Sequence, residues 1–121
     1  MAEIKGKGFE SPDEVRPFKE GKGQVELVDL NGHMIGRGTF EPGWRWSEHV
    51  KPLSGTDSCQ VEHIGYVVSG RLHVKHDDGT EGEVKSGEVY RVAPGHDAWV
   101  LGDEPAVFVE FQGAANYAKP S

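Results

Sequence analysis

Turn-forming residues recur at short intervals along this chain and divide it into brief runs of strand-forming residues. Asn31-Gly32 and Asp78-Gly79 lie between such runs, and dipeptides of this type favour tight hairpins. The runs cover residues 24–30, 33–41, 60–69, 71–76, 81–85, 88–93, 98–101 and 106–111. With 17 glycines in 121 residues and no amphipathic helical pattern of useful length, this spacing predicts an all-β fold, either a sandwich or a closed barrel.

The two ends of the chain differ from this strand-rich part. Residues 1–23 are polar and rich in glycine and charge, and residues 113–121 are irregular. We therefore expect one domain with an N-terminal arm (1–23) that contributes little core, a β-barrel (24–112) and a C-terminal tail (113–121). The arm is expected to pack over the barrel or a partner subunit, and residues 51–58 are expected to form a loop between two strands.

One pattern in the arm predicts a short helical turn. Ser11 is followed by Pro12, and Glu14 comes three positions after Ser11. Serine as the N-cap, proline at the first helical position and an acidic residue at the third position are typical of a helix start. Pro17 would end such a helix within about one turn.

Composition excludes several classes of partner and compartment. The net charge is −7 at pH 7 and the 13 basic residues are scattered, whereas a nucleic-acid site needs a clustered basic surface. No apolar run approaches the roughly 20 residues that span a bilayer. The N-terminus lacks the apolar core of a secretory signal, and Cys59 is the single cysteine. We expect a cytoplasmic protein without membrane contact, internal disulfide or nucleic-acid partner.

Glycines and histidines between positions 43 and 70 follow a known spacing. Gly43 is followed after five residues by His49, and His63 is followed after six residues by Gly70. These intervals resemble the first motif of the cupin superfamily, which runs from a glycine through a His-X-His pair and a glutamate to a second glycine. In this chain Lys51 stands where the motif has its second histidine, and His63 stands where it has glutamate.

A second stretch resembles the other cupin motif. Gly87 and Gly95 keep its frame. The motif's histidine falls on Ala98 and its asparagine on Gly102, while His96 comes two residues before the expected histidine. The glycine frame is therefore retained, and the metal-ligand set matches only in part.

The resemblance covers roughly residues 25–111. It implies a cupin-like double-stranded β-helix, a jelly-roll barrel. A small barrel of this kind leaves edge strands exposed, and pairing with a second copy covers them. We therefore expect a homodimer.

Four residues are candidate metal ligands: His49, His63, His96 and Cys59. Cys59 lies four residues before His63 and could replace the missing histidine of the first motif. Alternation along a strand puts Cys59 and His63 on one face if that strand begins early enough. The hypothesis is an interior His-based site for a divalent transition metal that acts on or binds a small organic molecule. Imidazole ligands leave zinc, iron, nickel, manganese and copper undistinguished, and a thiolate favours zinc or another softer ion.

The alternative hypothesis is a metal-free module that binds or senses a small molecule. The loss of the usual ligands at Lys51 and Ala98 favours it. Its pocket would be lined by aromatic side chains with one cation to hold an anionic group. The candidate lining residues are Trp44, Arg45, Trp46, Tyr66 and Trp99. Neither hypothesis decides whether the protein is an enzyme, because one fold supports many chemistries.

Overall fold

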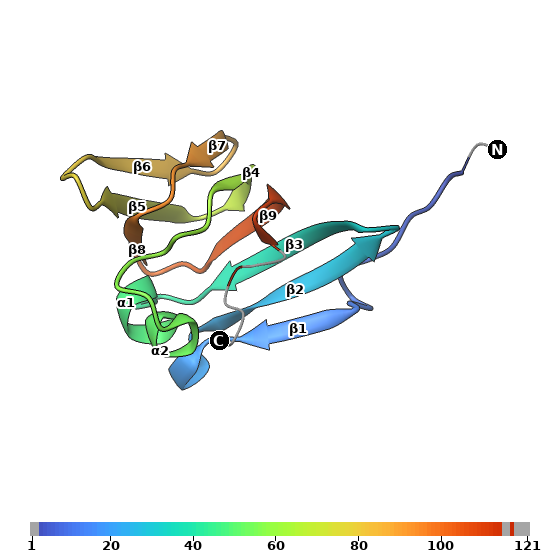
Figure 1. The fold of residues 1–121 in the computed structure, drawn as a ribbon, viewed down its shortest axis with the longest axis horizontal. Coiled ribbons are helices and arrows are strands. Elements are labelled where there is room, and N and C mark those ends of the chain that lie inside the picture. Colours follow the sequence, from blue (N-terminus) through green and yellow to red (C-terminus); the bar gives the residue numbers. More distant parts are fainter. Residues whose placement is uncertain (1–2, 115–116, 118–121) are drawn as a thin grey trace.

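Two antiparallel sheets form the structure, a computed structural model that describes residues 3–114 and residue 117 (Figure 1). The larger sheet has the strand order β1-β2-β3-β9-β4-β7 and the smaller sheet has the order β6-β5-β8. The strands are β1 (Glu14–Pro17), β2 (Gly23–Leu30), β3 (His33–Phe40), β4 (His63–Ser69), β5 (Arg71–His76), β6 (Glu81–Lys85), β7 (Val89–Val92), β8 (His96–Val100) and β9 (Ala106–Gln112). The helices are η1, a 3-10 turn (Lys19–Gly21), α1 (Trp46–His49) and α2 (Lys51–Ser54). Within the described ranges, no helix is long and apolar enough to cross a membrane.

The all-β prediction is confirmed, and two strands begin at residues that differ from those expected. The run expected over residues 60–69 becomes a strand only at His63. The run expected over residues 98–101 is already a strand at His96. A candidate metal ligand is therefore the first residue of each of these strands, where the chain enters a sheet.

The N-terminal helical turn exists, but it lies at Lys19–Gly21 and not at Ser11. The segment after Ser11 enters β1 instead, which pairs with β2 from Glu14 to Pro17. The backbone N–H of Asp13 donates to the carbonyl of Leu27 at 2.8 Å. The Asp13 carboxylate also accepts a hydrogen bond of 2.8 Å from the backbone of Asp29. These partners on β2 satisfy the backbone in an extended form, so the local helix pattern is overridden.

The loop expected over residues 51–58 is helical in its first half. Pro52 lies in the first turn of α2, where its missing N–H costs nothing. Gly55 ends the helix with φ +77°, a left-handed conformation that glycine adopts without strain. The expectation of a plain loop is therefore wrong for Lys51–Ser54.

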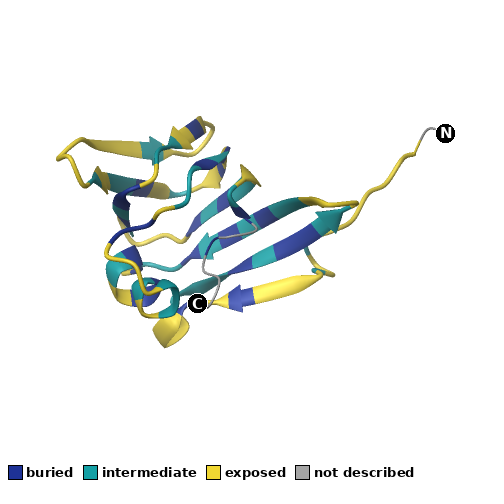
Figure 2. Cartoon of the chain, viewed as in Figure 1, coloured by how far each residue is buried: buried dark blue, intermediate teal, exposed yellow. Residues whose placement is uncertain are grey.

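The core lies between the two sheets and is rich in aromatic rings. The ring of Phe40 lies 4.6 Å from that of Trp44 and 5.3 Å from those of Phe18 and Phe108, between ring centroids. Each of these side chains is at most 6% exposed. Burying a side chain of this size stabilises the fold by roughly 1.5–3 kcal/mol. Figure 2 shows buried residues alternating with partly buried ones along strands such as β3 and β8.

Residues of the arm and of the expected C-terminal tail contribute to this core, which the polar composition of the arm did not predict. Phe18, Ala114 and Tyr117 are buried. The Arg16 guanidinium is buried and donates to the carbonyl oxygens of Ala114 at 3.3 Å and Tyr117 at 2.9 Å. The C-terminal segment is thereby held against β1, while the other residues expected in the tail after Ala114 lie outside the described part of the chain.

The outer face of β4, β7 and β9 exposes apolar side chains. Tyr66 on β4 is the register partner of both Val89 and Val109. Tyr66 is 40% exposed, Val89 72% and the nearby Phe111 52%. Tyr66 therefore belongs to the outer surface of the barrel, and the homodimer stays a prediction.

Two glycines with positive φ differ in how closely the surrounding backbone approaches them. A Cβ atom at Gly70 (φ +82°) would lie 2.6 Å from the backbone of both Pro105 and Ala106, whereas a Cβ at Gly79 (φ +94°) would meet nothing within 4 Å. Gly79→Ala should cost only the backbone strain of about 1–2 kcal/mol. Gly70→Ala adds a backbone overlap, so its loss of unfolding free energy should be larger by about 1 kcal/mol or more. Urea denaturation of both variants measures the difference, and equal midpoints would contradict it.

Candidate metal centre

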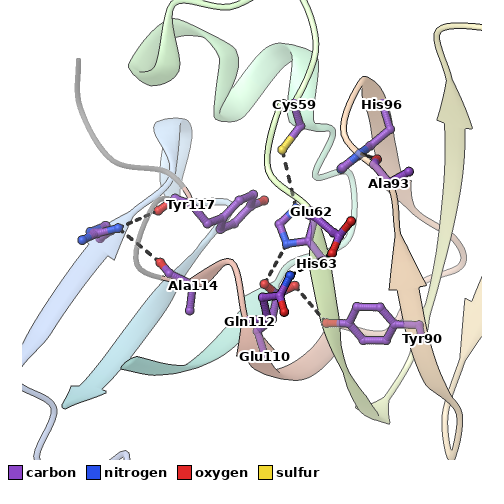
Figure 3. Close-up of polar contacts among 11 residues, drawn as sticks. Cys59, Glu62, His63, Tyr90, Ala93, His96, Glu110, Gln112, Ala114 and Tyr117 are labelled. Atoms are coloured by element: carbon purple, nitrogen blue, oxygen red, sulfur yellow. Dashed lines mark hydrogen bonds and ion pairs between the residues drawn. The ribbon is translucent and has the colours of Figure 1, made fainter. Parts of the chain in front are cut away.

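Three predicted ligands meet inside the barrel: Cys59, His63 and His96. One ligand atom from each lies within 4.8 Å of the other two, and all three residues are buried. They come from separate parts of the chain, namely the segment before β4, the start of β4 and the start of β8. Figure 3 shows the three side chains converging beside the carboxylate of Glu110.

Backbone pairing brings Cys59 and His96 together. The N–H of Cys59 donates to the carbonyl of His96 at 2.8 Å, and the carbonyl of Cys59 accepts from Gly95 at 2.7 Å and from His96 at 3.2 Å. Alternation along β8 then turns His96, Ala98 and Val100 inward, since all three are buried. His96 and Ala98 therefore share the inward face of β8.

Glu110 on β9 orients His63. The Nδ1 atom of His63 lies 2.7 Å from Oε2 of Glu110, and the Tyr90 hydroxyl donates to Oε1 at 2.9 Å. Gly65 is the register partner of both Tyr90 and Glu110. A Cβ at Gly65 would lie 2.6 Å from the Tyr90 hydroxyl oxygen, so the missing side chain gives the phenol its path across β4 to Glu110.

The two histidines use their ring nitrogens in the same way. The Nδ1–H of His96 donates to the carbonyl of Ala93 at 2.7 Å, as the Nδ1–H of His63 donates to Glu110. An acceptor on Nδ1 directs Nε2 toward the third ligand, and Nε2 of His63 lies 3.5 Å from the Cys59 sulfur. Metal-binding histidines commonly hold their second nitrogen in this manner.

These contacts shift the pKa values of Cys59 and His63 in the metal-free site. Burial disfavours the Cys59 thiolate, but hydrogen bonds from His63 and His96 outweigh it and lower the pKa of Cys59 to about 7. Burial likewise disfavours a charged His63, yet the Glu110 carboxylate and Cys59 raise the pKa of His63 to about 10. Between these two values the site holds a thiolate, an imidazolium and a carboxylate side by side.

The spacing suits a small transition metal ion. A zinc ion bound tetrahedrally about 2.3 Å from sulfur and about 2.1 Å from nitrogen places these two atoms roughly 3.6 Å apart. The distance from Cys59 Sγ to His63 Nε2 is 3.5 Å. The histidines border a cavity of about 30 Å³. Its other walls are Phe40, Trp44, Trp46, Leu72, Val74, Val84, Tyr90, Val92, Ala98, Phe108, Glu110 and Tyr117.

His49 does not join the other predicted ligands, which corrects the four-residue set. His49 is buried at the end of α1. Its Nδ1 accepts a hydrogen bond of 3.0 Å from the backbone of Arg45, and its Nε2 lies 3.1 Å from the carboxylate of Glu20. The short helix turns the ring toward its own N-terminus and the arm, so His49 has a structural role there.

The predicted aromatic pocket is divided between the inside and the outside of the barrel. Trp44 and Trp46 line the cavity. Trp99 points outward from β8, where its ring stacks on His73 at 4.7 Å between centroids and the Arg45 guanidinium lies 4.2 Å from its centroid. With Tyr66 on the outer surface as well, the five residues do not form one pocket.

Sequence reasoning missed the residues that support the ligands. Glu110 follows Ala106 and Phe108 on the inward face of β9. An acidic residue at an inward position of an alternating strand must have a partner. The sequence pattern of β9 could therefore have indicated Glu110. Tyr117 contacts the edge of the His63 ring at 5.1 Å between centroids, and nothing in the irregular tail indicated it.

Comparison with known proteins identifies the fold. No family model matches the sequence, and no curated protein does. Among solved structures, a protein of unknown function from Vibrio parahaemolyticus is similar with TM-score 0.59 and 19% identity, over 81% of this chain and 96% of that one. An RmlC-like cupin from Shewanella frigidimarina has TM-score 0.55 and 20% identity, over 85% of this chain and 86% of that one.

A larger enzyme shares the same architecture. Oxalate decarboxylase from Lactobacillus farciminis matches 85% of this chain with 32% of its own, at TM-score 0.57 and 19% identity. The protein therefore has the cupin fold, and the predicted jelly-roll barrel is confirmed. Its candidate ligands Cys59 and His63 differ from the histidine and glutamate of the cupin motif that the sequence resembles.

Replacing the Glu110 carboxylate tests whether its charge raises the pKa of His63. In metal-free protein, Glu110→Gln removes the charge that raises the pKa of His63, so this pKa should fall toward or below its usual 6.5. Tyr90→Phe is the matched control, because it removes a hydrogen bond to Glu110 but keeps the carboxylate, and His63 should stay charged near neutral pH. NMR titration of the His63 ring measures both, and an unchanged pKa in Glu110→Gln would contradict the assignment.

The same shift makes stability depend on pH. The folded-state pKa of His63 lies above its unfolded value of 6.5. Its contribution to stability is therefore complete below about pH 6.5 and is lost as pH rises through about 10. The lowered pKa of Cys59, about 7 against a usual 9.0, opposes this loss between about pH 7 and 9, so the net decline should appear from about pH 9 to 10, and Glu110→Gln should flatten it there in urea unfolding.

Proposed function

We propose that this cupin binds one divalent transition metal ion through Cys59, His63 and His96, with a fourth coordination position open to the interior cavity. The observation that carries the proposal is that the two histidines are hydrogen-bonded in the same way. Each has an acceptor on Nδ1, from Glu110 or from Ala93. Each therefore offers Nε2 to a common point beside the Cys59 sulfur.

The donor atoms narrow the choice of metal. Two imidazole nitrogens and one thiolate suit zinc, copper, iron or nickel, whereas manganese prefers oxygen ligands. A thiolate with two imidazoles fits zinc well, and the Cys59–His63 separation matches tetrahedral geometry. Zinc is therefore the ion that we expect first.

Three protein ligands with an open position are typical of catalytic sites, whereas structural zinc sites are closed by four protein ligands. A metal ion held here would supply Lewis-acid polarisation of a bound group. The chain's own residues orient the ligands: Glu110 holds the orientation of the His63 ring, and Tyr90 holds Glu110. The walls around the centre are largely apolar, and an apolar surrounding strengthens the interaction of a bound group with charge.

Metal content tests the proposal directly. Protein purified without a histidine tag, or reconstituted with zinc, should bind about one equivalent by elemental analysis. Cys59→Ser and His63→Ala should each weaken binding by at least tenfold, because each removes a ligand.

Two other histidines serve as controls. His49→Ala and the half-exposed His73→Ala should keep one equivalent, since neither residue belongs to the cluster. Loss of metal in His49→Ala alone, with Cys59→Ser unaffected, would overturn the ligand assignment. Absence of metal after reconstitution would overturn the proposal and favour the metal-free binding module.

The affinity for metal should rise with pH, because the ion and the protons compete. Between about pH 7 and about pH 10 the metal-free site holds a proton on His63 that binding must release. Affinity should therefore rise about tenfold per pH unit there, and more steeply below pH 7, where Cys59 is also protonated. Competition with a chelator at several pH values measures this slope, and a constant affinity from pH 7 to 9 would contradict it.

A further inference from the structure

A cavity lies between β6 and β7, which are the last strands of different sheets. β6 ends the smaller sheet and β7 ends the larger one, so each has an edge that no other strand of the described chain covers. A turn at Ser86-Gly87 joins the two strands, and Figure 1 shows them on the same side of the molecule. Residues 81–84 and 91–93 border the cavity, which measures about 520 Å³. We call it the outer cavity.

The interior is closed more tightly on its other sides. Along β8, the bridges Arg45–Trp99 and Cys59–His96 connect the smaller sheet to the segments before α1 and before β4. Beneath the C-terminal tail, the cavity that borders Glu110 measures only about 10 Å³, which is no more than one water needs. Of these sides, that of β6 and β7 is the most open.

Three valines separate the outer cavity from the candidate metal centre. Val74, Val84 and Val92 border both the outer cavity and the inner cavity of about 30 Å³ beside the centre. A further contact joins the two spaces. Ala93 borders the outer cavity, and its carbonyl accepts the 2.7 Å hydrogen bond from Nδ1 of His96. The outer cavity therefore reaches the residue that holds one of the candidate ligands.

Val84 is the one residue of β6 that is not exposed. The other four residues of Glu81–Lys85 are exposed, and Val84 is half-buried. Its register partner Leu72 is buried and borders the inner cavity. A segment with few buried contacts opens locally at a lower free energy than the core does. The contact of Val84 with the interior is therefore what holds the edge of β6 closed.

We propose that small organic molecules reach the Cys59–His63–His96 cluster through the gap between β6 and β7, and that Val84 closes this passage. The inference concerns the route into the barrel, so it goes beyond the metal site and holds for the protein without metal. The valine side chains make the passage apolar, which suits an uncharged probe.

Alkylation by iodoacetamide, measured on metal-free protein, tests the route. Cys59 is the single cysteine and is 2% exposed, so the rate at which mass spectrometry detects one adduct reports access to the cluster. Val84→Ala removes part of the contact that closes the gap, and the rate should rise about fivefold or more. Val84→Ile keeps the contact, and its rate should stay within about twofold of wild type.

Val25→Ala is the matched control. It is the same change of side chain at a residue that is 3% exposed and borders the small cavity beneath the tail. Its rate should stay within about twofold of wild type. Loss of a deeply buried side chain destabilises the fold, so alkylation through unfolding would be faster in this variant too. If Val84→Ala fails to fold, Val92→Ala tests the opposite side of the gap, with the same rise expected.

The results decide the inference separately from the proposed function, because metal is removed before alkylation. Faster alkylation in Val84→Ala, with wild-type rates in Val84→Ile and Val25→Ala, supports the passage. A wild-type rate in Val84→Ala, or an equal or larger rise in Val25→Ala, would overturn it. Neither of these results bears on metal content, and failure to bind zinc leaves the passage untouched.

Discussion

The backbone pairing of Cys59 with His96 is the constraint on which the centre depends. It joins the segment before β4, in the larger sheet, to the first residue of β8, in the smaller sheet. Two ligands are thereby set by main-chain hydrogen bonds, which define direction more strictly than side-chain contacts do. His63 then follows along the same segment and turns inward at the start of β4. The geometry of the candidate centre is therefore a consequence of barrel closure.

Charge alternates through the interior from Cys59 to His63 to Glu110. Burying any one of these groups alone would be costly, and each is stabilised by its oppositely charged neighbour. In the metal-free protein the proton on His63 supplies the positive charge between two negative groups. A metal ion would take over that role, with the ring neutral and the ion as the cation. Either a proton on His63 or a metal ion would thus balance the two negative groups beside it.

The strands from β2 onward were predictable from sequence because turn chemistry is local: Asn31-Gly32 forms its hairpin whatever the rest of the chain does. The strand β1 was not, because it forms only by pairing with β2. The meeting of Cys59, His63 and His96 was partly predictable from alternation. The position of His49 was not, because four residues of α1 rotate its ring toward Glu20, and such a short helix leaves no periodic signal. Phe18 was not predicted because it is the single buried apolar residue among residues 3–23 of an otherwise polar arm.

Gly65 links the backbone of the larger sheet to the chemistry of the centre. Its missing side chain leaves the space that the Tyr90 phenol crosses to reach Glu110. Tyrosine at 90 therefore requires glycine at 65, and the carbonyl oxygen of Val109, which the same Cβ would overlap, adds to this constraint. Glycine at 65 with tyrosine at 90 would mark relatives that hold their histidine as this protein does, even where overall identity is too low to align the ligands.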